Sequence, residues 1–273
     1  MRRPEASSIS RRTRMAFVAL FSLACFSLAH DTWILPDRPR ADAGKTVRLR
    51  ATSGMAFPRL EVAIAPDRIE RAGLRIGGSG TALGEGTKGE KSLDLTVRPD
   101  RAGVAVAWLE SKPRSLDLKP EQVEEYLAEI GAEEIAREWK ANADKTWHET
   151  YAKHAKTFFR VGAESGDRSW GEPVGMAIEI VPEADPTRLA AGQELPARVF
   201  KDGRPLAGFP VTALAADQKT GVLARTDTEG RVRFRLDRAG WWLFKGTEIK
   251  RAPGSASDWE SHFTTLTVFV GAP

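Results

Sequence analysis

Four histidines are the side chains of this sequence that are best suited to bind a transition metal: His30, His148, His154 and His262. Neutral imidazole nitrogens suit nickel, copper, cobalt and zinc. Beyond residue 29 the chain has no cysteine and only two methionines, Met55 and Met176, which argues against a soft Cu(I) site. Each histidine is therefore a candidate ligand for a divalent ion.

The first 29 residues have the layout of a secretory signal peptide. An arginine-rich start precedes the apolar run MAFVALFSLACFSLA (15–29), which is too short to span a bilayer comfortably. Small residues at Ser27 and Ala29 predict cleavage after Ala29, so that His30 becomes the N-terminus and offers both its ring and its α-amine to a metal. We expect a periplasmic or secreted protein with no membrane span and no lipid anchor at Cys25.

The charge balance excludes an extended nucleic-acid interface. The chain carries 41 Lys and Arg against 37 Asp and Glu, but the leader alone holds five arginines and one acid. Its removal leaves 36 basic and 36 acidic residues. Nucleic-acid binding needs a surplus of basic residues on one face, and the mature chain has no such surplus.

The segment HETYAKH (148–154) looks superficially like the zinc-protease motif HExxH. Its second histidine, His154, follows His148 at i+6 instead of i+4, which turns the two side chains about 120° apart around a regular helix. Both could reach one ion only if the helix ended or bent between them. We therefore do not expect a metalloprotease.

No other motif predicts catalysis. The sequence lacks a Gly-x-Ser-x-Gly nucleophile elbow, and its carboxylate pairs, such as Glu124-Glu125, are adjacent on predicted solvated helices. We therefore expect a protein that is not an enzyme.

Short apolar stretches between glycine, proline and charged turns predict a mainly β fold. Alternation in VRLRA and SLDLTVR is typical of strands with one buried face, and we expect strands at Leu93–Val97 and Val104–Glu110 among others. After the PEADP turn, further strands at intervals of about 8–12 residues are typical of an immunoglobulin-like sandwich.

Helical spacing interrupts this β pattern between Pro120 and Thr157. One pattern ends at Gly131, and a second runs from about Glu133 to Thr157 with its tryptophans on one stripe, which we expect to pack in a core. We predict a signal peptide (1–29) followed by two β-sandwich domains. The first is an N-terminal β-rich domain (30–182) that carries a helical hairpin insertion at about 120–157. The second is a C-terminal immunoglobulin-like sandwich (183–273).

The sequence resembles a family of bacterial periplasmic proteins that is known as a domain of unknown function, some of whose members are described as nickel or cobalt transport components. The resemblance runs from about residue 30 to 273 and rests on the ordered set HDTW, YAKHAKTFFRVG, EIVPEADP, KDGRPLAGFPV, TDTEGRVRF and DWESHFTTLTV. It implies a secreted metal-related binding protein with His30 as the first ligand candidate. Its Tyr-x-Lys-x-x-Lys element adds Tyr151, Lys153 and Lys156 as further candidate contacts.

These observations favour a periplasmic protein that binds a divalent transition metal, nickel or cobalt first and copper or zinc as alternatives, and delivers it to a metal-uptake membrane transporter. His30 would open the site, and the other three histidines would complete it. One alternative is an adhesion, carbohydrate-binding or scaffold module that presents tryptophans such as Trp241, Trp242 and Trp259. A third is a copper-dependent oxidase built on the N-terminal histidine.

Overall fold

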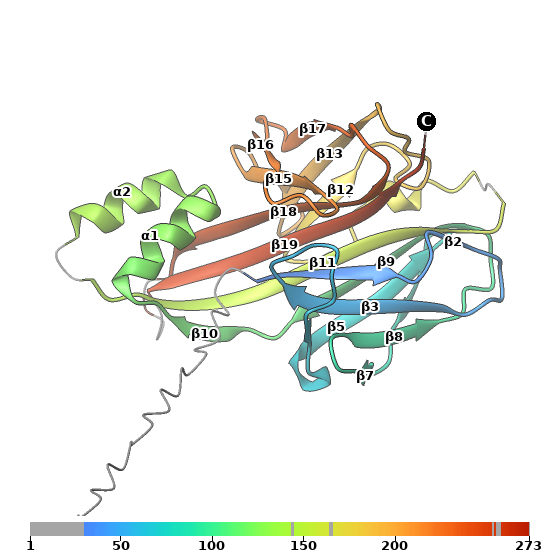
Figure 1. Cartoon of the computed structure of the whole chain (residues 1–273), viewed down its shortest axis with the longest axis horizontal. Helices are drawn as coiled ribbons and strands as arrows, with labels where there is room; N and C mark the ends of the chain where they lie inside the picture. The colour runs from blue at the N-terminus through green and yellow to red at the C-terminus, as the bar shows by residue number, and fades with distance from the viewer. Residues whose placement is uncertain (1–29, 143–144, 164–165, 253, 255–257, 273) are drawn as a thin grey trace, which may run out of the picture.

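A computed structural model of the chain describes residues 30–142, 145–163, 166–252, 254 and 258–272 (Figure 1). The predicted leader, with Cys25 and the cleavage site after Ala29, lies outside these residues. The described part forms three β-sheets and two α-helices, which confirms a mainly β fold. Its helices are too short and too polar to cross a membrane.

The central sheet has ten strands and runs the length of the molecule. Its order is β16-β15-β18-β19-β11-β9-β5-β6, and β10 and β2 both pair with β11. In that order its strands are Val222–Arg225, Pro210–Ala215, Gly240–Arg251, Trp259–Val270, His148–Val161, Gly103–Ser111, Ile69–Ile76 and Ser79–Ala82, with β10 at Arg114–Asp117 and β2 at Arg40–Ala41.

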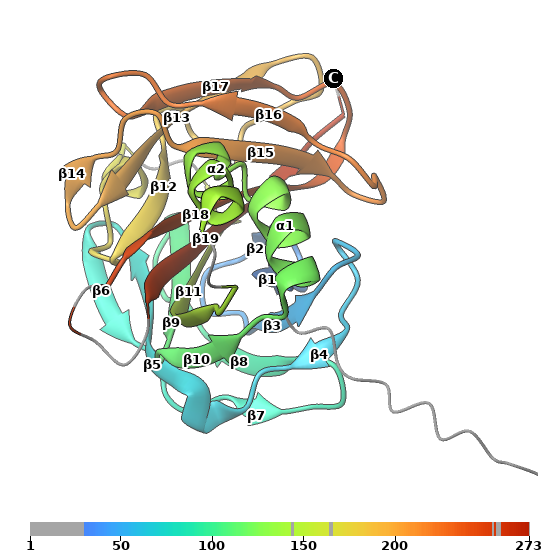
Figure 2. The ribbon, with the colours of Figure 1, turned by 90° about the vertical axis from the view of Figure 1, so that its left-hand side faces the viewer.

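A smaller sheet covers each face of the central one, as Figures 1 and 2 show above and below the long strands. The N-terminal sheet contains β1 (Asp31–Pro36), β3 (Val47–Gly54), β4 (Val62–Ala63), β7 (Thr87–Lys88) and β8 (Leu93–Val97). The C-terminal sheet contains β12 (Ile178–Pro182), β13 (Glu194–Lys201), β14 (Arg204–Pro205) and β17 (Arg231–Arg235). Short 3₁₀ turns lie at Pro66–Arg68 and Ser169–Gly171.

Strand β9 shows why the central sheet holds these two layers together. Val104 and Val106 point into the core shared with the C-terminal sheet, whereas Ala105, Ala107 and Leu109 point into the core shared with the N-terminal sheet. Successive side chains of a strand leave on opposite faces, so one strand serves both cores. The central strands are therefore buried on both sides.

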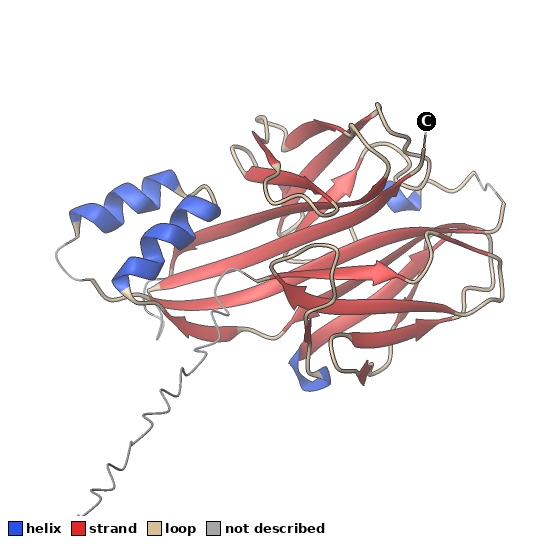
Figure 3. Ribbon diagram, in the orientation of Figure 1, coloured by secondary structure: helices blue, strands red, loops and turns tan. Residues whose placement is uncertain are grey.

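The two helices, α1 (Pro120–Glu129) and α2 (Glu133–Ala141), lie at one end of the long strands (Figure 3). They pack on an aromatic cluster in which Trp147 stacks on Trp259 with ring centroids 4.9 Å apart and meets Trp139 edge-on at 5.6 Å. Trp139 and Trp147 are buried, so these tryptophans are packing residues, as predicted.

The predicted helix from Glu133 to Thr157 is wrong in its second half. Helix α2 ends at Ala141, and His148–Val161 form β11, a fourteen-residue strand. Both faces of β11 are covered and both carry buried polar as well as apolar side chains, which removes the alternation that marks a half-buried strand.

The predicted boundary at residue 182 falls within a continuous hydrogen-bonded framework. Strand β11 pairs in parallel with β19 from Glu149↔Trp259 to Thr157↔Thr267, so N-terminal and C-terminal strands share the central sheet. Strand β12, before the boundary, pairs with β13 beyond it. The two-domain division stays a prediction.

Candidate functional site

His154 and His262 meet on the face of the central sheet that the C-terminal sheet covers. In the parallel register of β11 and β19, His262 lies beside Ala152 and His154 beside Thr264, so the two histidines are diagonal neighbours. His154 Nε2 lies 3.0 Å from His262 Nδ1. The His154 side chain is 4% exposed and that of His262 is 13% exposed.

A carboxylate holds the other nitrogen of each ring. Glu110 Oε1, at the end of β9, lies 2.9 Å from His154 Nδ1. Glu260 Oε1, two residues before His262 on the same face of β19, lies 2.9 Å from His262 Nε2. The four side chains form a hydrogen-bonded row from buried Glu110 to half-exposed Glu260.

The number of protons in this row follows from the hydrogen bonds. If Glu110 and Glu260 are ionised, both only accept, so His154 Nδ1 and His262 Nε2 must each donate. The contact between the rings then needs one further N–H. Three protons on four nitrogens give the histidine pair a single positive charge. If both nitrogens between the rings carried a proton, two N–H donors would face each other and neither could accept a hydrogen bond.

Neighbouring groups support this charge distribution. Burial alone would raise the pKa of Glu110, but hydrogen bonds from His154, Arg71 and the Ala177 backbone hold it below its ordinary value. Burial lowers the pKa of His262, and its hydrogen bond to Glu260 offsets only part of this effect. A state in which both histidine rings are positively charged is therefore disfavoured.

A further carboxylate, Glu248, stands directly across from His262 in the register of β18 and β19. Burial raises the pKa of Glu248, although Lys201 and Lys250 oppose the effect. Among the described residues no donor reaches its buried Oε2 atom. Lys250 Nζ lies 3.6 Å from Glu260 Oε1 and balances the outer end of the row.

The other two histidines are not part of this row. His148 begins β11, where its Nδ1 lies 2.7 Å from Asp117 Oδ1. Because residues 148–154 form a strand, His148 and His154 share a face but lie about 20 Å apart, at roughly 3.3 Å per residue. The helix geometry expected for this segment is therefore wrong, and these two residues cannot hold one ion.

His30 lies on the opposite face of β11. Its backbone oxygen accepts a hydrogen bond from Lys153 Nζ. Lys153 and His154 are consecutive in the strand, so their side chains leave on opposite faces. Burial, together with the charge of Lys153, lowers the pKa of the His30 ring. Of the four predicted ligands, the structure thus brings together only His154 and His262.

Tyr151, Lys153 and Lys156 also divide between the two faces. Lys156 points toward the C-terminal sheet and pairs with Glu179 at 2.6 Å, both side chains being 1% exposed. Lys153 points the other way, with its Nζ 5.6 Å from the centre of the Tyr151 ring. Burial lowers the pKa of Lys153 to about 8.

The sequence prediction missed Glu110, Glu248 and Glu260. The contact between Glu260 and His262 could have been predicted from the sequence, because residues at i and i+2 of a strand share a face. The contact between Glu110 and His154 could not, since only the pairing of β9 with β11 brings these two residues together. Within the described ranges, no group of three or more His, Cys, Asp or Glu side chains is arranged to hold a metal ion.

The tryptophans of the adhesion alternative are mostly internal. Trp242 and Trp259 are 4% and 3% exposed. Trp241 points to the other face of β18 from Trp242, as alternation predicts, and lies edge-on to Phe269 with ring centroids 5.3 Å apart. These side chains do not form an exposed aromatic surface.

Comparisons with known proteins place the chain in a family. No curated protein matches its sequence. Among solved structures, the D0–D1 domain of intimin is 17% identical, covers 88% of this chain and 98% of its own, and has a TM-score of 0.22. Mouse CEACAM1b is 8% identical and has a TM-score of 0.22, and the match covers 89% of this chain and 100% of the CEACAM1b chain. The sequence matches the domain of unknown function DUF4198 over residues 27–247, so the chain belongs to that family, which confirms the resemblance to a domain of unknown function.

Proposed function

We propose that this protein binds a divalent transition metal at His154 and His262, nickel or cobalt first, in the periplasm. The observation that carries the proposal is the pair of imidazole nitrogens 3.0 Å apart, each on a ring whose other nitrogen is held by a carboxylate. Metal-binding histidines commonly donate their second N–H to such a carboxylate, which fixes the tautomer and raises the basicity of the ligand. An ion would replace the one proton between the rings.

The spacing of the two nitrogens favours particular metals. Nitrogens bound at about 2.0–2.1 Å on neighbouring corners of a square or an octahedron lie about 2.9 Å apart, against about 3.4 Å in a tetrahedron. The separation of 3.0 Å is closer to the first value. Square-planar nitrogen sites suit Ni²⁺ and Cu²⁺, whereas Zn²⁺ is usually bound in a tetrahedron.

The small number of protein ligands fits delivery of the metal rather than permanent storage. Two imidazoles leave the remaining coordination positions to water or to groups of a partner, so an ion can be exchanged. Glu260, which is 39% exposed, marks the end of the row from which an ion would enter. We infer that a metal-uptake transporter in the membrane receives the ion.

Calorimetric titration with nickel, cobalt, copper and zinc tests the proposal, with cobalt binding also followed by its visible absorption. We expect saturable nickel and cobalt binding that His262→Ala and His154→Ala weaken by about tenfold or more. His148→Ala is the matched control, because this residue starts the same strand as His154 but lies outside the row. His30→Ala tests the N-terminal histidine separately.

Two results would overturn the proposal. One is the absence of saturable binding of any of the four metals. The other is binding that His154→Ala and His262→Ala leave unchanged. If His30→Ala alone abolished binding, the metal would lie at the N-terminus and the paired histidines would be structural.

A further inference from the structure

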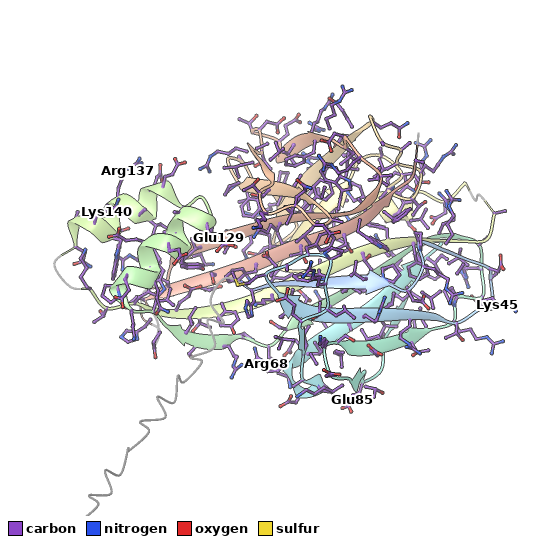
Figure 4. The ribbon with its side chains drawn as sticks, in the orientation of Figure 1. Lys45, Arg68, Glu85, Glu129, Arg137 and Lys140 are labelled. Atoms are coloured by element: carbon purple, nitrogen blue, oxygen red, sulfur yellow. The ribbon has the colours of Figure 1, made fainter. Side chains whose placement is uncertain are left out.

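A cavity of about 220 Å³ lies on the opposite face of β11 from the histidine pair. The polar part of its lining consists of Lys153, Arg68, Arg114 and His30, together with residues such as Tyr151 and Ser111. Arg68, labelled in Figure 4, belongs to the turn that precedes β5. No aspartate or glutamate is among the described residues that line the cavity. A cavity with this lining attracts anions.

The acidic residues near this cavity are already engaged elsewhere. Asp31, Glu61 and Glu129 are close enough for their charges to act on His30. Lys245 Nζ binds Asp31 Oδ2 at 2.8 Å and Glu129 Oε1 at 3.2 Å. The Glu61 carboxylate accepts hydrogen bonds from two backbone N–H groups. These contacts leave the positive charges of the cavity without a carboxylate in its wall.

Contacts with neighbouring residues fix the position of the Lys153 ammonium group without using all of its N–H donors. Its Nζ lies 5.6 Å and 5.7 Å from the ring centres of Tyr151 and Phe263, which is within cation–π range. It donates one hydrogen bond to the backbone oxygen of His30. An ammonium group has three N–H donors, so two can serve a bound ligand. Burial outweighs the charge of nearby Asp31 and lowers the pKa of Lys153, a cost that an anionic ligand would offset.

Part of the lining of the cavity is apolar and consists of Val62, Ala63, Ile64 and Leu109. A strongly hydrated inorganic anion gains nothing from such a lining, whereas an aliphatic group buries its surface there. Arginine also matches a carboxylate with two parallel hydrogen bonds. We propose that this cavity binds a small organic carboxylate, with its charge on Lys153, Arg68 and Arg114 and its aliphatic body against the apolar lining.

Titration of the purified protein with hexanoate, hexanamide and inorganic phosphate tests this assignment. We expect saturable binding of hexanoate and markedly weaker binding of the neutral amide and of phosphate. Lys153→Met and Arg114→Gln should each weaken hexanoate binding by about tenfold, the size of one charge-assisted hydrogen bond. Arg114 is exposed, so its variant tests the basic lining of the cavity without changing a buried residue.

Two control variants distinguish binding in this cavity from binding at a different part of the protein. Arg101→Gln removes a half-exposed arginine that does not line the cavity and should leave hexanoate binding unchanged. His262→Ala should also leave it unchanged, because the histidine pair lies on the other face of β11. The proposal is overturned if hexanoate does not bind, if hexanamide or phosphate binds as tightly, or if neither Lys153→Met nor Arg114→Gln weakens binding.

Discussion

The ring of His154 touches the ring of His262 although the two residues are 108 positions apart in the chain. The contact depends on the parallel pairing of β11 with β19, which joins strands from the two halves of the sequence. Glu110 reaches the same row from β9, the neighbour of β11 on its other side. The candidate metal site is therefore a property of the central sheet and not of any local motif.

Glu260→Gln tests the role of the carboxylate that holds His262. The amide keeps the shape of the side chain but removes the charge that stabilises the N–H donor of the ring. We expect metal affinity to fall by about tenfold, as is typical when an outer partner of a metal-bound histidine is changed. Calorimetric titration measures the change, and Glu183→Gln on the surface is the control. Unchanged nickel affinity would contradict a positioning role for Glu260.

Much of the fold is predictable because its strands are short runs of apolar or alternating residues that end at turns. The stretches Leu93–Val97 and Val104–Glu110 are expected as strands and are observed as β8 and β9. Short runs of apolar residues between turns are enough to identify such elements. Helix α1 is likewise predicted by its spacing, from Pro120 onward.

The part of β11 from His148 to Thr157 could not be predicted in the same way, because polar and charged side chains interrupt the apolar ones on both of its faces. One face carries His154, Lys156 and Phe158, and the other carries Lys153 and Phe159. Charged and apolar side chains therefore mix on each side, and the pattern of period two disappears. Burial of these charges depends on partners far away in the chain, such as Glu179 for Lys156.

Lys156→Met tests that buried ion pair. The substitution keeps the bulk of the side chain, and among the described residues it leaves the Glu179 carboxylate with the backbone donors of Val174, Gly175 and Met176. Removing one partner of a buried pair costs about 3–5 kcal/mol. We expect a loss of this order in urea unfolding at pH 7. The double variant Lys156→Met, Glu179→Gln should recover part of it, and a single variant as stable as the wild type would contradict the argument.

The same pair predicts a dependence on pH. Burial raises the pKa of Glu179, but the charge of Lys156 and the backbone donors outweigh it and hold the pKa below the ordinary value of 4.5. A carboxylate with a lowered pKa stabilises the fold above its unfolded pKa, and this contribution is lost as the pH falls through the folded value. The difference in stability between wild type and Lys156→Met should therefore shrink below about pH 4.5. Urea unfolding from pH 7 to pH 3 measures it, and a constant difference would show that the ion pair is not its source.

Trp147→Ala tests how the helices are attached to the sheet. Trp147 stacks on Trp259, contacts Trp139 and donates from Nε1 to Glu149 at 2.9 Å. Truncation of a buried tryptophan costs about 3–5 kcal/mol through lost contacts and the cavity it leaves. We expect a loss of this size in urea unfolding, together with a changed near-ultraviolet circular dichroism spectrum. Trp241→Ala, at a less buried position, is the control and should cost less; equal losses would contradict the central role of Trp147.

Lys153→Met tests the cost of a buried ammonium that lacks a carboxylate in its cavity. The folded pKa of Lys153 is about 8, against an ordinary 10.5, because burial penalises the charged form. Between these two pH values the unfolded chain binds more protons than the folded protein, so the wild type gains stability as the pH rises from 8 to 10.5. The shift corresponds to an upper limit of about 3 kcal/mol. Without added carboxylate, Lys153→Met should be more stable than the wild type at pH 7, and its advantage should decline from pH 8 upward. Urea unfolding at several pH values measures this difference, and the exposed Lys88→Met should show no such dependence. An advantage that stayed constant up to pH 10 would mean that packing, and not the buried charge, distinguishes the two proteins.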